Sequence, residues 1–154
     1  MNEFIPLKDY KLVTFTKDDI ENIKRIKTYS KRNCRNKIET TYITQVLKNF
    51  DFGIGYFRTE ILNNDISKIR PCAFACIKFQ ENGNLFLLLI CALKNDDKLG
   101  TKILNELFIF AKKNRYNKIT LECNKDNVNF YKKFDFIEDI ILNDNLFSMT
   151  KDIY

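Results

Sequence analysis

The sequence predicts an α/β protein of one domain, with about seven strands and flanking helices. Two observations predict this class. The stretch from Leu85 to Phe136 reads as strand, polar turn, helix, strand and short helix. Before it, Asn82-Gly83 is a strong hairpin signal that joins an earlier apolar run to Leu85. Antiparallel strands are therefore expected first, and strands that alternate with helices are expected later.

The helices are predicted from apolar residues at helical spacing. Thr16 has the character of an N-cap, and Asp18 and Asp19 would complement the helix dipole in the first turn. The basic, polar stretch Ser30–Lys37 reads as a loop. The predicted helices are Lys17–Tyr29, Thr41–Phe50, Leu99–Lys112 and Asp126–Phe134.

The strands are predicted from short apolar or alternating runs that end at turn residues. Arg70–Gln80 has Pro71 at its start, where a missing N–H does least harm. Leu85–Ala92 is apolar throughout and reads as a buried central strand. The other predicted strands are Tyr10–Phe15, Gly53–Leu62, Lys118–Cys123, a strand that follows Phe136 and ends at Leu142, and Leu146–Ile153.

The composition is that of a folded domain. The chain has 154 residues, of which 45% are hydrophobic, and this is enough for a real core. The formal net charge is +6, but the lysines are spread along the chain, so we expect no nucleic-acid partner. No apolar run reaches about 18 residues, and Met1–Tyr10 lacks a signal-peptide core, so we expect a cytoplasmic protein without a membrane span.

The sequence contains no histidine, which removes Ser-His-Asp and Cys-His catalysis and the common metal triads. Proton transfer must then use a carboxylate, Tyr, Lys, Cys or water. The cysteines are odd in number and lie mostly in apolar strands, which predicts reduced thiols in a reducing compartment. Because Cys72 and Cys76 lack further ligands, they read as small core residues and no metal is expected.

The segment ITLECNKDNVNFYKKFDF, from Ile119 to Phe136, carries a resemblance to a known family. With the strand, loop and helix before it, the segment resembles the acetyl-CoA site of the Gcn5-related N-acetyltransferases (GNAT). Within them it is most similar to the glucosamine 6-phosphate N-acetyltransferases. The resemblance implies the GNAT fold, a mixed sheet in which strands 4 and 5 are parallel and splay apart around the cofactor. Here these strands would be Leu85–Ala92 and Lys118–Cys123.

The turn before Gly100 keeps only part of the family's phosphate-binding loop. The sequence from Asn95 to Gly100 is NDDKLG, where the family has Gln or Arg, two variable residues, Gly, one variable residue, and Gly or Ala. Gly100 would let the backbone approach a pyrophosphate, and Lys98 would add positive charge. Asp96 and Asp97 have the wrong sign and must point away. An ordinary strand-to-helix turn is the alternative reading.

The resemblance also implies roles for individual residues. The backbone of the apolar strand would pair with the pantetheine arm like an added strand. Tyr131 would protonate or hydrogen-bond the departing thiolate, although an aromatic residue on a short helix is more often core. The implied cofactor-binding residues are Leu88, Leu89, Ile90, Asn95, Lys98, Leu99, Gly100, Thr101, Asn127 and Phe130.

Glu122 stands between Leu121 and Cys123 in a strand that looks buried. An unpaired buried carboxylate is costly, so the side chain is expected to face a cleft. The similar family carries an acid here, near the substrate amine, where Glu122 would orient the ammonium or help to remove its proton. A structural salt bridge is the alternative.

The residues expected to hold the sugar depart from the family pattern. Phe86 and Leu87 occupy the positions of an acidic pair that helps to hold the sugar. The family's C-terminal phosphate-binding arginine is also absent, which leaves Lys151, Arg70 or Lys78 as possible substitutes. The acceptor is therefore either glucosamine 6-phosphate in a rebuilt pocket or a different amine.

The sequence thus favours an acetyl-CoA-dependent N-acetyltransferase that transfers directly to an amine. Glucosamine 6-phosphate, an intermediate of amino-sugar synthesis, is the preferred acceptor. A protein lysine, a protein N-terminus or a polyamine is the alternative acceptor, and a non-catalytic coenzyme A-binding module is a further alternative. The resemblance also implies a homodimer whose subunits share the active site.

Overall fold

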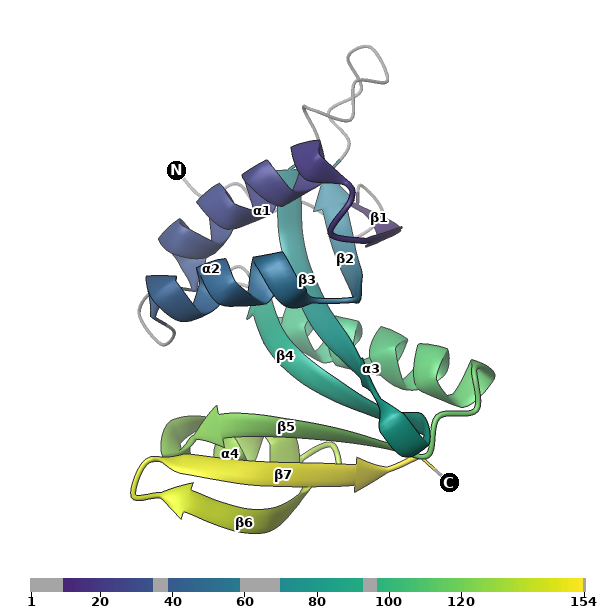
Figure 1. Cartoon of the computed structure of the whole chain (residues 1–154), viewed down its shortest axis with the longest axis vertical. Coiled ribbons are helices and arrows are strands. Elements are labelled where there is room, and N and C mark those ends of the chain that lie inside the picture. The colour runs from purple at the N-terminus through teal and green to yellow at the C-terminus, as the bar shows by residue number, and fades with distance from the viewer. Residues whose placement is uncertain (1–9, 35–38, 59–69, 93–96, 154) are drawn as a thin grey trace.

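The computed structural model describes residues 10–34, 39–58, 70–92 and 97–153. Helices and strands alternate much as predicted (Figure 1). The elements are β1 (Tyr10–Phe15), α1 (Ile20–Asn33), α2 (Thr40–Asn49), β2 (Phe52–Arg58), β3 (Arg70–Gln80), the 3₁₀ turn η3 (Glu81–Gly83), β4 (Asn84–Ala92), α3 (Asp97–Lys113), β5 (Lys118–Asn124), α4 (Lys125–Lys132), β6 (Ile137–Asn143) and β7 (Leu146–Asp152).

The strands form one mixed sheet of seven strands in the order β1-β2-β3-β4-β5-β7-β6. Every neighbouring pair is antiparallel except β4 and β5, which run parallel. The predicted fold class is therefore confirmed. The parallel pair is possible because α3 carries the chain back across the sheet between the two strands.

Two groups of helices cover the sheet. In Figure 1, α1 and α2 lie in front of the middle strands, while α3 and α4 lie behind the sheet. Each pair of helices closes its own hydrophobic cluster. One cluster centres on α3, with Leu104 and Leu107 fully buried, and the other centres on α1 and α2, with Ile26 and Ile43 fully buried. We call these two sides of the sheet the α3–α4 face and the α1–α2 face.

A β-bulge in β4 changes which residues face which helices. Cys76 of β3 pairs with Leu89 while Ile77 pairs with Leu87, so Leu88 is an extra residue in β4. Before the bulge, Leu87 packs on the α3–α4 face; after it, Leu89 packs on the α1–α2 face. A continuous apolar run hides this switch, because both faces of the strand are buried.

The hairpin between β3 and β4 forms where Asn82-Gly83 predicted it. Both residues adopt positive φ, 64° for Asn82 and 73° for Gly83. Asn117, which precedes β5, donates a side-chain hydrogen bond of 2.9 Å to the Asn82 carbonyl oxygen. The turn is thereby fixed against the start of the parallel strand.

Both predicted ends of the first helix need correction. Helix α1 starts at Ile20 with Asp19 as its N-cap, because Thr16 forms a turn in which its N–H bonds the Asp19 carboxylate at 2.7 Å. The helix also continues to Asn33, into the stretch predicted as a loop. Strand β2 ends at Arg58, and the rest of predicted strand Gly53–Leu62 lies outside the described residues.

The expectation that all cysteines are reduced is wrong for Cys34 and Cys91. The structure joins them in a disulfide with Cα atoms 5.9 Å apart, across a sequence separation of 57. Helix α1 packs against β3 and β4, and this places Cys34, just after the helix, beside Cys91 near the end of β4. Cys72, Cys76 and Cys123 are buried, as expected for core thiols.

Among the residues described, no helix is both long and apolar enough to cross a membrane.

Candidate active site

The parallel ladder between β4 and β5 is short. It pairs Asn84–Leu87 with Lys118–Leu121 and then ends, although β4 continues to Ala92 and β5 to Asn124. In Figure 1 the two strands meet beside the hairpin and diverge toward their C-terminal ends. The predicted splay of strands 4 and 5 is therefore confirmed. Beyond Leu87, no strand of the described residues pairs with the side of β4 that faces β5.

The bulge lies at the start of this splay. Leu88 is the first β4 residue beyond the ladder, and its side chain is half-buried on the α1–α2 face. Leu89 is buried on the same face, and Ile90 packs against the α3–α4 cluster. Their side chains pack on the two faces of the sheet, which leaves backbone groups along the open side of β4 to pair with a ligand.

The N-terminus of α3 lies just after the C-terminal end of β4. Lys98 is exposed, Gly100 and Thr101 are half-buried, and Leu99 is fully buried in the core. Leu99 can therefore contact a ligand only through its backbone. The N–H groups of the first helical turn have no partners inside the helix and favour an anion. Asn95 lies outside the described residues.

Gly100, in the first turn of α3, lies between the end of β4 and helix α4. A Cβ atom built on Gly100 would lie 3.8 Å from Cζ of Phe130 in α4 and 4.0 Å from Cβ of Ala92 in β4. These are ordinary contact distances, so packing within the chain does not require glycine here. Gly53 differs, because a Cβ there would overlap the ring of Phe15. The absence of a side chain at Gly100 leaves the helix backbone open to a ligand.

Tyr131 lies in α4 and is almost fully buried. The rings of Phe130 and Phe136 pack edge-on against its ring, with distances between ring centres of 5.1 and 5.6 Å. Burial, with smaller contributions from Cys123 and Tyr42, raises the pKa of this hydroxyl above its ordinary value. The group therefore keeps its proton at neutral pH. Asn127, one turn earlier in α4, is half-buried.

Glu122 is exposed, whereas its neighbours in the strand are buried. Its neighbours Leu121 and Cys123 point into the α3–α4 cluster, so Glu122 projects from the opposite, α1–α2 face. No lysine or arginine of the described ranges forms an ion pair with it. Among the described residues, Glu122 therefore has no partner for the alternative role, a structural salt bridge.

Sequence reasoning missed Tyr42. This residue of α2 donates a hydrogen bond of 2.6 Å from its hydroxyl to the carbonyl oxygen of Leu88, the bulge residue. Burial and the nearby Glu122 carboxylate raise the pKa of the Tyr42 hydroxyl. A single tyrosine on the outer side of a helix gives no local signal, so only the folded chain reveals that it reaches the splay.

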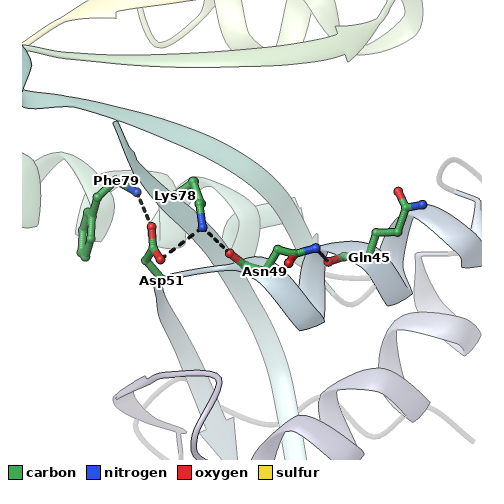
Figure 2. A network of polar contacts seen from close by, with 5 residues as sticks. All are labelled: Gln45, Asn49, Asp51, Lys78 and Phe79. Carbon is green, nitrogen blue, oxygen red and sulfur yellow. Dashed lines mark hydrogen bonds and ion pairs between the residues drawn. The ribbon is translucent and has the colours of Figure 1, made fainter. Parts of the chain in front are cut away.

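The two lysines considered for binding the substrate phosphate, Lys78 and Lys151, are engaged in contacts outside the splay. Lys78 donates to the carbonyl oxygen of Asn49 at 2.8 Å and pairs with Asp51 at 3.3 Å, beyond the end of α2 (Figure 2). Lys151 donates to the carbonyl oxygen of Phe134 at 2.8 Å and lies 4.9 Å from the ring centre of Phe108, on the α3–α4 face. The side chain of Arg70 is not among those described.

The two positions at which the similar family has an acidic pair carry apolar residues, and these residues lie in the paired part of the sheet. Phe86 and Leu87 pair with Thr120 and Leu121 in the closed part of the ladder. Leu87 is buried in the α3–α4 cluster, and Phe86 is half-buried. In the ranges described, no three metal-ligating side chains stand close enough together to hold a metal ion.

A mixed sheet of seven strands with a splayed parallel pair, followed by a helix at the mouth of the splay, is the architecture of the GNAT acyltransferases. No protein-family model and no curated protein matches the sequence. Solved structures do match the fold over nearly the whole chain.

One match is the ribosomal-protein-S18-alanine N-acetyltransferase from Escherichia coli, with a TM-score of 0.71, 13% identity and 94% of each chain covered. Another is the PaiA N-acetyltransferase from Thermoplasma acidophilum in complex with coenzyme A, with a TM-score of 0.64, 17% identity, and 93% and 98% covered. A GNAT-family structure from Desulfovibrio desulfuricans matches with a TM-score of 0.69, 10% identity, and 94% and 100% covered. The chain has the GNAT fold.

Proposed function

We propose that the protein is an acetyl-CoA-dependent N-acetyltransferase that transfers the acetyl group directly to an amine. The observation that carries the proposal is the end of the β4–β5 ladder at Leu87 and Leu121, with the open backbone of Gly100 near Ala92 at the C-terminal end of the same strand. Similar folds belong to N-acetyltransferases, one of them a coenzyme A complex. The open strand, the helix N-terminus and the glycine suit a thioester with a diphosphate tail.

Each group in the splay has a distinct role in this proposal. Acetyl-CoA supplies an activated acetyl group. Backbone N–H groups near Ile90 polarise the thioester carbonyl, and the first turn of α3 holds the diphosphate with Lys98 and Thr101 beside it. Asn127 and Phe130 of α4 complete the cofactor side.

The transfer step needs one bond formed, one broken and one proton supplied. The amine nitrogen attacks the carbonyl carbon, the C–N bond forms and the C–S bond breaks. The Tyr131 hydroxyl, which is neutral, hydrogen-bonds or protonates the departing thiolate. Glu122 and solvent remove the proton that the amine loses.

Glucosamine 6-phosphate remains the acceptor that the sequence resemblance favours. It would need a cation for its phosphate, and Lys78 and Lys151 are both engaged away from Glu122. This observation favours the second candidate, an amine without a phosphate, such as a protein N-terminus, a protein lysine or a polyamine. A coenzyme A-binding module without catalysis is the third possibility.

We also propose a homodimer. Strand β6 forms one edge of the sheet, and it exposes the aliphatic side chains of Ile137, Ile140, Ile141 and Leu142. An apolar edge strand with free backbone groups favours pairing with another strand. An antiparallel β6–β6 contact across a two-fold axis would extend the sheet and cover these side chains. A cytoplasmic location stays a prediction, and the Cys34–Cys91 disulfide removes the cysteines as an argument for it.

One experiment separates the acceptor classes. The full chain is mixed with acetyl-CoA and, in turn, glucosamine 6-phosphate, glucosamine, spermidine, or peptides with a free N-terminus or lysine, and free thiol is measured. Thiol release with any amine supports the enzyme, and the amine that reacts names the class. Binding of coenzyme A without release in any mixture would leave only the module, and absence of both would exclude the proposal.

A further inference from the structure

We infer that Tyr42 is a binding residue for the acceptor, and that its hydroxyl oxygen and the Glu122 carboxylate together receive the amino group. This inference rests on the proposed function and deepens it, because it assigns the acceptor side of the splay and the chemical class that fits there. That class is a cationic primary amine whose nitrogen is not flanked by an anionic group.

The hydrogen bond of Tyr42 determines what its oxygen can offer. A tyrosine hydroxyl has one proton, and Tyr42 donates it to the Leu88 carbonyl oxygen at 2.6 Å. The oxygen is then left with lone pairs only, so it can accept but not donate. An amine or ammonium group donates N–H bonds and matches this oxygen, whereas a phosphate or carboxylate does not.

The location of Leu88 puts this oxygen at the reacting end of the splay. Leu88 is the bulge residue and the first β4 residue without a partner on β5. The Tyr42 hydroxyl is also close enough to Tyr131 to contribute to the raised pKa of that hydroxyl. Tyr42 thus approaches from the α1–α2 face, and Tyr131 from the α3–α4 face, so the two tyrosines lie on opposite sides of one opening.

Glu122 supplies the negative charge of the proposed acceptor site. It is exposed on the same α1–α2 face as Tyr42, and its carboxylate influences the Tyr42 hydroxyl, which burial keeps neutral. Its nearer neighbours of the same face on β5 and β7 are uncharged: Thr120, Asn124, Leu146, Ser148 and Thr150. The charged residues of that face, Lys118 and Asp152, stand opposite each other at the far end of the ladder, at the start of β5 and the end of β7. A carboxylate and a neutral acceptor oxygen form a site that attracts a cation and repels an anion.

This face is open to an acceptor. In the part of the chain that the structure describes, α1 and α2 contact β3 and β4, and no helix lies in front of β5, β7 and β6 (Figure 1). An amine can therefore reach Glu122 from solvent without crossing the cofactor side. The amine enters as an ammonium, gives one proton to Glu122 or water, and attacks with its lone pair.

The test uses Tyr42→Phe in the full chain, with Tyr29→Phe as its matched control. Tyr29 of α1 likewise donates a hydrogen bond of 2.6 Å to a strand carbonyl oxygen, that of Cys72. Initial rates of thiol release are measured at saturating acetyl-CoA with spermidine, glucosamine and an N-terminal peptide. Coenzyme A dissociation constants and melting temperatures are measured for each protein.

We expect Tyr42→Phe to raise the KM for the amine by about tenfold or more, as for loss of a hydrogen bond to a charged group. Glu122→Gln should raise it similarly, while the coenzyme A dissociation constant changes less than about twofold in both variants. Tyr29→Phe should leave the KM unchanged at a comparable loss of melting temperature.

Three results would overturn the inference alone: an unchanged amine KM in Tyr42→Phe, an equal rise in Tyr29→Phe, or a loss confined to coenzyme A binding. Faster turnover with glucosamine 6-phosphate than with glucosamine would also contradict the predicted acceptor class. If the unmodified protein acetylates none of the amines, the proposed function fails, and the inference fails with it.

Discussion

Leu87 and Leu121 are the last two residues that pair between β4 and β5. Directly beyond them stand the bulge residue Leu88 on one strand and Glu122 on the other. The end of a parallel ladder inside a sheet leaves backbone groups that need partners. The Tyr42 hydroxyl satisfies one of them, the Leu88 carbonyl oxygen, and the proposed pantetheine arm would satisfy others.

Replacement of Tyr131 tests the proton donor. Tyr131→Phe keeps the packing of the ring but removes the hydroxyl, so kcat should fall by about a hundredfold while the coenzyme A dissociation constant stays constant. Steady-state rates and equilibrium binding check this. Tyr116→Phe is the control, since Tyr116 stacks on Phe110 at 6.0 Å outside the splay. An unchanged kcat would exclude Tyr131 from the reaction.

Alkaline pH should destabilise the protein. Burial raises the pKa of the Cys76 thiol and of the Tyr131 hydroxyl, so the folded protein holds protons that the unfolded chain releases. This stabilisation is fully present below the unfolded pKa, about 8.5 for Cys and about 10 for Tyr, and declines above it.

Chemical denaturation at a series of pH values should therefore give a free energy of unfolding that falls from about pH 8.5 upward. The slope should steepen above about pH 10, and Tyr131→Phe should reduce that second decline. A free energy that stays level to pH 11 would contradict the buried environment of both groups.

The two glycines Gly100 and Gly53 should respond differently to alanine. Gly100→Ala should preserve or raise the melting temperature, because the new methyl group meets no clash and alanine favours a helix by up to about 1 kcal/mol. It should weaken coenzyme A binding by about tenfold, because a methyl group would hold the diphosphate away from the backbone.

Gly53→Ala is the matched control, since its methyl group would overlap the Phe15 ring and lower the melting temperature. Calorimetry and binding titrations on both variants separate the two effects. Coenzyme A binding that is equally strong in Gly100→Ala would remove the helix N-terminus from the site.

The disulfide between Cys34 and Cys91 should be measurable by thiol labelling. Unfolded protein that has not been reduced should bind maleimide only at Cys72, Cys76 and Cys123, and reduction should add the other two sites. Closure of a loop with a sequence separation of 57 stabilises by about 4 kcal/mol through the unfolded chain. Reduction, or Cys34→Ser, should lower the free energy of unfolding by up to this amount. Labelling at all five sites without reductant would refute the crosslink.

The proposed dimer contact through the edge strand β6 can be tested by introducing a charged side chain. Ile140→Lys should convert a dimer to a monomer in sedimentation velocity, because the charge would be buried in a β6–β6 contact. Ile109→Lys in α3 is the control, since both isoleucines are 59% exposed. A monomer for the unmodified protein, or a dimer that survives Ile140→Lys, would contradict the proposed contact.

Sequence patterns predicted much of this fold because their causes are local. Arg70–Gln80 is a strand as predicted, since alternating apolar residues suit a buried sheet. The Asn82-Gly83 turn follows from residues that tolerate positive φ. Thr16 misled the prediction of α1, because its hydroxyl stabilises a turn before the helix rather than the helix end itself.

The sequence by itself determined the order of elements, the seven strands and a glycine at the start of α3, since each depends on residues close in the chain. Only the tertiary structure decided the Leu88 bulge, the Cys34–Cys91 bond and the contact of Tyr42 with the splay. These three features depend on contacts between segments that are distant in the sequence. A continuous apolar strand or a single tyrosine gives no local sequence signal of such a contact.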